Sequence, residues 1–197
     1  LEEQGDSTIN IILPEAQETD IPRSVLAIRN AIKQRNLPCS AITVQDILND
    51  SLSKALLPDK DNYLLFNTER YSNLSVLMPM VMRAVQGNKV TLISQYSWQH
   101  EPIRIPQIYP SVFAVSQDSA YNDSAYMAYN RRYEALLGAE HESELPRYDL
   151  LGYDMMRQLD AEWKNQEYKG LQSEIDYQRT DSTGGYINRA IRIVHKQ

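Results

Sequence analysis

The sequence predicts an α/β protein with a doubly wound, mostly parallel sheet, flanking helices and a β-hairpin near the C-terminal end. Three observations lead to this prediction. Short apolar segments typical of strands alternate with segments of helical periodicity through the first half of the chain. The segment YLLFN at residues 63–67 is continuously apolar, as expected of a strand buried on both faces. Near the C-terminal end, residues 171–194 alternate and are split by DSTGG at 181–185, typical of a hairpin turn with glycine at positive φ.

The composition narrows the classes of function. The 197 residues are long enough for one sizeable domain or two small ones, and the 42% hydrophobic share is enough for a core. A net charge of −6 without clustered Lys and Arg argues against nucleic acid as the main partner. The skew to 13 Tyr against 2 Phe and 2 Trp favours hydrogen-bonding contact surfaces. No apolar run approaches the roughly 18 residues of a membrane span.

The first strand is expected at residues 8–14 (TINIILP), a β-branched run that ends in proline. A helix should then begin with Asp20 as N-cap and Pro22 in its first turn, and end at residues 36–38. Its apolar face is spaced i, i+4, i+7, i+11 and comprises Ile21, Val25, Ile28 and Ile32.

A second strand is expected at residues 40–45, a short helix at 47–57 and the third strand at 63–67. Residues 73–86 predict a helix in which Pro79 causes a kink or a late start. The fourth strand should be residues 89–95. The residues of that helix expected to face inward are Leu74, Leu77, Met78, Val81, Met82 and Val85.

Residues 97–110 contain three prolines and are expected to form an extended linker. A fifth strand is predicted at residues 111–117 and a helix at 119–137, which Gly138 ends. Four residues of this helix are expected to be buried, namely Tyr126, Tyr129, Tyr133 and Leu137.

The last helix contains the Tyr-Asp pair twice, in RYDLLGYDMMR at residues 147–157. Five residues turn a helix by about 500°, so Asp149 and Asp154 lie roughly 140° apart and cannot form a close carboxylate pair. Asp149 should instead meet the positive end of the helix, and Asp154 should pair with Arg157. Gly152 is expected to mark a close approach to another backbone. The predicted buried stripe is Tyr148, Leu151, Met155 and Leu159.

Several short motifs occur in an order that resembles the C-terminal half of type 1 periplasmic binding proteins, the leucine-binding-protein-like superfamily. These motifs are QYSW at residues 95–98, YNRRYEALLG at 129–138, LGYDM at 151–155, and GLQ at 170–172 with GGYIN at 184–188. More narrowly, the chain is similar to envelope proteins of Bacteroidetes that carry a LysM peptidoglycan-binding region ahead of such a domain. The resemblance covers nearly the whole chain.

The resemblance implies two lobes with a ligand between them. Residues 1–101 and 166–197 would form the second lobe, and residues 102–165 would be the returning portion of the first lobe. The early strands of the first lobe are missing from the chain, so the fold would be partial. The chain begins with LEEQGDS rather than Met, so we expect a processed product of a longer, exported protein with upstream domains.

Ligands of open α/β sheets bind at the carboxyl ends of the strands, where three predicted loops lie. These are residues 15–19, 68–72 and 96–100. Aromatic and polar side chains in the second and third loops predict a small-ligand wall. The expected ligand-binding residues are Glu69, Arg70, Tyr71, Tyr96, Trp98 and His100. The alternatives are that Tyr96 and Trp98 cover the junction between lobes, and that Glu69 and Arg70 begin a solvated helix.

The sequence holds no GxSxG, Walker A, GxGxxG or HExxH motif, so we expect no enzyme and no cofactor. Ser94 and Ser97 precede His100, but polar residues are common at the end of a strand. The three histidines are scattered, so no metal site is predicted. Cys39, the one cysteine, begins an apolar run and is expected to be buried.

Two functions from different classes follow. The first is a non-catalytic binding domain of the periplasm or cell envelope, which holds a small polar solute or a peptidoglycan-derived ligand in a cleft between lobes. The second is a structural or protein-interaction domain that keeps the fold without a small ligand. A homodimer is possible, because the missing lobe would leave sheet edges exposed.

Overall fold

The computed structural model describes residues 9–16, 19–112, 124–140, 147–173 and 175–197. The chain forms two compact units. Unit 1 comprises Leu1–Tyr109 and Val194–Gln197, and unit 2 comprises Pro110–Ile193. The assignment of residue ranges to lobes of a two-lobed protein stays a prediction.

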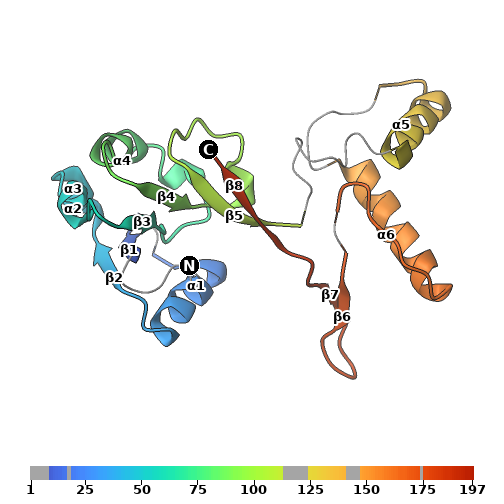
Figure 1. The fold of residues 1–197 in the computed structure, drawn as a ribbon, viewed down its shortest axis with the longest axis horizontal. Helices are drawn as coiled ribbons and strands as arrows, with labels where there is room; N and C mark the ends of the chain where they lie inside the picture. The colour runs from blue at the N-terminus through green and yellow to red at the C-terminus, as the bar shows by residue number, and fades with distance from the viewer. Residues whose placement is uncertain (1–8, 17–18, 113–123, 141–146, 174) are drawn as a thin grey trace. The chain divides into compact units, whose positions relative to one another are not determined.

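Unit 1 is built on a six-stranded sheet with the strand order β2-β1-β3-β4-β5-β8. The pairs β1–β2, β1–β3, β3–β4 and β4–β5 are all parallel. The predicted α/β class with a mostly parallel sheet is therefore confirmed (Figure 1). The strands are β1 (Ile9–Pro14), β2 (Cys39–Ile42), β3 (Asp61–Leu64), β4 (Val90–Ile93), β5 (Gln107–Ser111) and β8 (Arg192–Lys196).

Helices cover both faces of this sheet (Figure 1). On one face, α1 (Arg23–Gln34) packs Ile32 against Ile9, Ile11 and Leu65. The larger core on the other face combines residues of α2 (Val44–Leu48), α3 (Leu52–Ala55) and α4 (Met78–Ala84) with alternate residues of the strands. Alternation of side chains along each strand explains why Ile11 and Ile12 belong to different cores.

The prolines decide where two elements of unit 1 begin. Pro79 lies in the first turn of α4, so the helix starts at Met78 rather than at residue 73, as the late-start alternative predicts. Strand β5 starts at Gln107, inside the segment expected to be a linker, because Pro106 only precedes it and Pro110 needs no donor near its end. Residues 113–117 of the predicted fifth strand lie outside the described residues.

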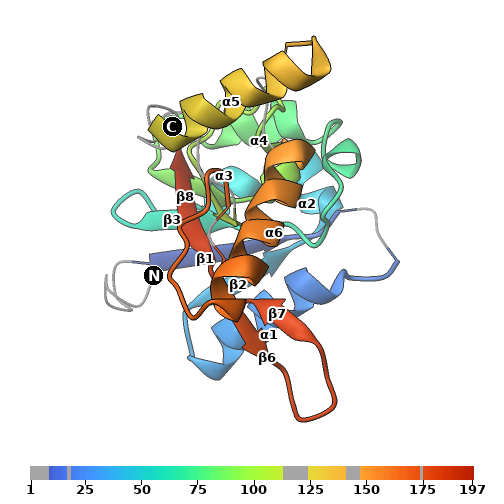
Figure 2. The same cartoon turned by 90° about the vertical axis from the view of Figure 1, so that its right-hand side faces the viewer.

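Unit 2 contains α5 (Ser124–Leu137), α6 (Tyr148–Trp163) and the strands β6 (Tyr177–Arg179) and β7 (Tyr186–Asn188). Figure 2 shows α5 beside the N-terminal end of α6. The two strands pair antiparallel, which confirms the predicted C-terminal hairpin. Neither glycine of its turn has positive φ. At Gly184 a Cβ would overlap the Thr180 hydroxyl, so a larger residue there would require that side chain to move.

The predicted buried face of α6 is wrong. Tyr148 and Leu159 are 75% and 52% exposed, whereas Leu150 and Asp154 are fully buried. Gly152 has open space around its Cβ position, so no backbone among the described residues approaches it closely. In α5, Tyr126 is buried as predicted but Leu137 is exposed.

The predicted burial of Cys39 is also wrong. The residue is exposed on β2, which lies at the edge of the sheet. The apolar run therefore predicts the strand correctly, but it does not predict that Cys39 on this edge strand faces solvent.

Candidate functional site

The strand order of unit 1 defines a candidate binding edge. Strand β1 lies between β2 and β3, so the chain moves from β1 to β2 on one side and then returns to β3 on the other side. In such sheets the crevice for a ligand opens where the winding reverses, outside the carboxyl ends of the two central strands. Here that point lies between the loops that follow β1 and β3, which are two of the three predicted ligand loops.

Hydrogen bonds of buried and exposed polar groups connect the loop after β3 to the segment between β1 and α1. The Asn67 side chain is buried after β3, and its Oδ1 accepts a hydrogen bond from the Ala16 backbone N–H after β1. The Ser24 hydroxyl, at the start of α1, donates to the Glu69 carboxylate. Because each bond joins segments that are far apart in sequence, the loop after β3 is held in one position.

Trp98, in the loop at residues 96–100, supports the loop after β3. Its indole Nε1 donates to the Glu69 carbonyl oxygen at 2.8 Å, and its ring is 2% exposed. Tyr71 packs edge-on against it with ring centroids 6.2 Å apart. Trp98 thus positions Glu69 and Tyr71 and offers almost no surface to solvent.

The remaining predicted site residues differ in exposure. Arg70 and His100 are exposed, and the Thr68 hydroxyl accepts a hydrogen bond from the Arg70 backbone N–H at 3.0 Å. Burial, and then the nearby Glu101, raises the pKa of Tyr71, so its hydroxyl stays protonated and can donate. Tyr96 is half-buried and lies edge-on to Tyr109. The edge therefore presents a cation, a carboxylate and a phenol within one short loop.

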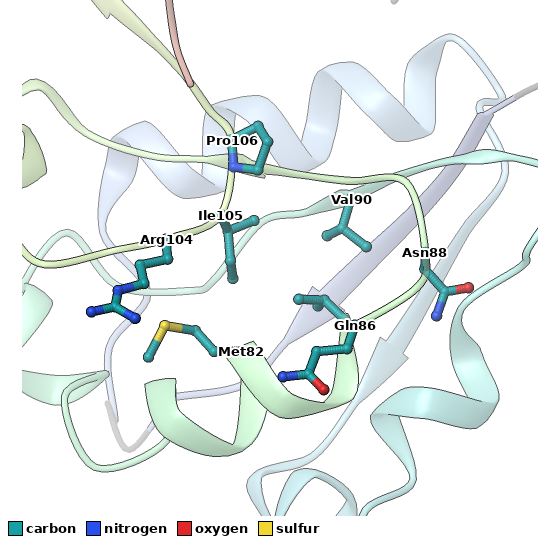
Figure 3. Close-up of a pocket in the computed structure, with 8 residues that line it drawn as sticks. Met82, Gln86, Asn88, Val90, Arg104, Ile105 and Pro106 are labelled. Atoms are coloured by element: carbon teal, nitrogen blue, oxygen red, sulfur yellow. The ribbon is translucent and has the colours of Figure 1, made fainter.

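An open pocket of about 450 Å³ lies elsewhere on unit 1. It lies at the opposite end of the strands, where β4 and β5 begin, and contains none of the predicted site residues. Figure 3 shows Met82, Val90 and Ile105 lining it, with three polar side chains around them. These are Gln86, Asn88 and Arg104.

Unit 2 holds a buried polar cluster that sequence reasoning missed. The Asp154 carboxylate, fully buried on α6, does not pair with Arg157 as predicted. It accepts hydrogen bonds from the Tyr168 hydroxyl and from three backbone N–H groups, those of Leu171, Gln172 and Ser173, at 2.8 to 3.1 Å. A carboxylate that accepts this many bonds can stay buried without a cation. Gly170 lets the turn close around it, because a Cβ there would overlap the Ser173 carbonyl.

Arg147 forms the second half of this cluster. Its guanidinium is fully buried, and it donates to Asp149 at 2.6 Å, to Asn130 at 2.8 Å and to the Tyr126 hydroxyl at 3.1 Å. Its backbone and the Gln172 side chain exchange two hydrogen bonds. Every partner belongs to unit 2, so the cluster joins α5, α6 and the turn at residues 170–173.

The predicted position of Asp149 in the first turn of α6 is correct. Burial acts to raise the pKa of its carboxyl, but hydrogen bonds from Arg147, Leu150 and Tyr129 outweigh it and lower the pKa. Burial and Asp149 together raise the pKa of Tyr129 to about 12, so this phenol remains a donor. Both aspartates of the repeated Tyr-Asp pair are thus occupied with structural bonds.

The described part of the chain contains no group of three or more His, Cys, Asp and Glu that could hold a metal ion. The Ser94 hydroxyl is buried and makes no hydrogen bond within that part, so Ser94 pairs with no histidine there. Among the described helices, none is long and apolar enough to cross a membrane.

No known protein-family profile matches the chain, and no curated protein is detectably similar to it.

Proposed function

We propose that unit 1 is a non-catalytic binding domain for a small polar solute, which lies at the carboxyl edge of the sheet between the loops after β1 and β3. The observation that carries the proposal is the strand order with its reversal beside β1. The loops at this edge are held by long-range hydrogen bonds before any ligand arrives. Such preorganisation lowers the entropy that a ligand must otherwise offset on binding.

The chemistry of the edge suggests a solute with both charges or with several hydroxyl groups. Arg70 would pair with a carboxylate or donate a hydrogen bond to a hydroxyl oxygen, and the Glu69 carboxylate would accept hydrogen bonds from an ammonium or hydroxyl group. The family resemblance supports the same class of ligand, an amino acid, sugar or cell-wall fragment, and a location in the periplasm or cell envelope. The cleft between two lobes stays a prediction.

The experiment is a titration that reads Trp98 alone. The chain has two tryptophans, and Trp163 is 93% exposed on unit 2, so Trp163→Phe leaves Trp98 as the single reporter beside Glu69. Amino acids, sugars and muropeptides are titrated while emission and thermal unfolding are recorded. A solute at about 100 times its Kd should add about 2.7 kcal/mol of stability, a rise in Tm on the order of 10 °C.

One arginine variant and one lysine variant distinguish binding at the proposed edge from a general effect of removing a positive charge. Arg70→Ala should weaken binding about tenfold or more, because it removes the exposed cation at the edge. Lys89→Ala is the matched control, since Lys89 is exposed before β4 at the opposite end of the sheet. Equal loss in both variants, or no response to any solute in the library, contradicts the proposal.

A second function, that of a protein-interaction domain, is favoured by the large apolar side chains that unit 2 exposes. Trp163, Tyr148 and Met156 are 93%, 75% and 67% exposed. This function predicts association without any response to the solute library.

A further inference from the structure

Helix α6 has two faces of different character. Its buried residues, Leu150, Asp154 and Ala161, belong to the interior of unit 2. The opposite face carries six residues that we call the α6 stripe, namely Tyr148, Gly152, Met155, Met156, Leu159 and Trp163. The five side chains of the stripe are between 43% and 93% exposed, and the Cβ position of Gly152 faces open space. At about 100° per residue the stripe lies within an arc of about 100°.

We propose that the α6 stripe is the interface of a homodimer in which α6 of two copies packs antiparallel. The stripe is symmetric about the bond between Met155 and Met156. In an antiparallel pair centred there, each member of the stripe meets another member of the same stripe on the second copy. Tyr148 faces Trp163, Gly152 faces Leu159, and Met155 faces Met156. A two-fold interface requires this kind of self-complementarity, because one patch must fit itself.

The sizes of the facing residues also match. Leu159 of one copy projects toward Gly152 of the other, where no side chain stands in its way. The two methionines at the centre are flexible and fill irregular gaps well. Aromatic rings close both ends of the stripe. Ridges of side chains on one helix pack into the grooves of its neighbour, and Gly152 widens the groove that receives Leu159.

The apolar area of the stripe suits a weak dimer. The exposed fractions, taken with the usual areas of Tyr, Trp, Met and Leu side chains, correspond to on the order of 600 Å² per copy. Two copies together would bury about 1,200 Å², the lower end of specific interfaces. We therefore expect a dissociation constant in the micromolar range. Each chain carries a net charge of −6, so added salt should strengthen the dimer by screening this repulsion.

Sedimentation of the full chain over about 1 to 500 µM measures this association. The wild type should shift from monomer to dimer, and Met156→Glu should weaken the dimer at least tenfold, because each interface then buries two unpaired charges. Val76→Glu is the matched control, since Val76 is 75% exposed on unit 1. Far-UV circular dichroism and Tm verify that both variants stay folded. A wild type that is monomeric throughout, or a Met156→Glu variant that dimerises as the wild type does, overturns the proposal.

A charge pair then tests the antiparallel register. Met155→Lys and Met156→Glu should each be monomeric alone, whereas an equimolar mixture should form a heterodimer. In that heterodimer the introduced lysine of one copy faces the introduced glutamate of the other, while the two remaining methionines meet at the second contact. Failure of the mixture to associate better than either variant alone overturns the antiparallel arrangement.

Discussion

Asp154 is the residue on which the interior of unit 2 depends most. Its carboxylate is fully buried, yet it satisfies three consecutive backbone N–H groups and the Tyr168 hydroxyl. The motifs GYD and GLQ, which are separate in sequence, are therefore parts of one structural unit. The aspartate of the first motif holds the backbone of the second, and Gly170 permits the turn.

Replacing Asp154 with Ala should destabilise unit 2 by about 3 to 5 kcal/mol, because three buried N–H groups lose their acceptor together. Asp154→Asn keeps one acceptor oxygen and should cost less. Urea unfolding followed by circular dichroism measures both variants. Asp160→Ala is the control, since its carboxylate is partly exposed and only pairs with Lys164 and Arg157. Equal stability of Asp154→Ala and the control contradicts this assignment.

Asp149 should make the stability of unit 2 depend on pH in the acidic range. Its pKa is lowered in the folded protein, so the folded state binds the proton less readily than the unfolded chain does. The stability that follows is complete above the unfolded value of about 4 and is lost as the pH falls through the lower folded pKa. Asp149→Asn should therefore be less stable at neutral pH and should lose less stability between about pH 4 and pH 2.

Thermal unfolding at several pH values measures this slope. Asp59→Asn, an exposed replacement before β3, should keep the slope of the wild type. If Asp149→Asn also keeps that slope, the bond to Arg147 contributes nothing to acid stability.

At the scale of the element, α6 shows what periodicity can and cannot predict. The i, i+3 and i+4 spacing of its apolar residues identifies a helix correctly, but it selects the wrong face as buried. The buried face contains Arg147 and Asp154, whose polarity hides it from any search for apolar residues. Their burial is possible only because partners from α5 and the turn at residues 170–173 satisfy them, and those partners are far away in sequence.

Gly152 tests this orientation of α6. The position is inside the helix and a Cβ there meets nothing within 4 Å. Gly152→Ala should therefore stabilise the protein by about 0.5 to 1 kcal/mol, because alanine loses less backbone entropy on folding. Gly87→Ala is the counterpart, and it should destabilise, since Gly87 has a φ of +81°. Differential scanning calorimetry compares the two. Gly152→Ala that destabilises the monomer would mean that another part of the same chain closely covers the outer face of α6.

At the scale of the whole molecule, the sequence predicts the α/β class, the alternation of strands and helices in unit 1 and the hairpin of unit 2. It does so because apolar periodicity and the positions of proline and glycine act locally. It misplaces β5 because Pro106 only precedes that strand and Pro110 is tolerated near its end. It buries Cys39 because an apolar run does not reveal which strand lies at an edge.

The candidate site was predictable only in part. The order of strand and loop places residues 68–72 and 96–100 at one edge of the sheet, and the strand order then adds the reversal beside β1. The buried position of Trp98 and its bond to the Glu69 carbonyl depend on tertiary packing, which no local pattern encodes. Trp98 is accordingly a positioning residue in the proposed site. Arg70 is the exposed residue that we propose contacts the solute.

Binding of a small polar solute at the carboxyl edge of unit 1 is tested most directly by amide chemical-shift mapping. The labelled full chain is titrated with the solute that gives the largest thermal shift. We expect perturbations at residues 15–16, 67–71 and 96–100. Perturbations confined to the pocket at residues 82–90 and 104–106, or spread evenly over both units, would contradict it.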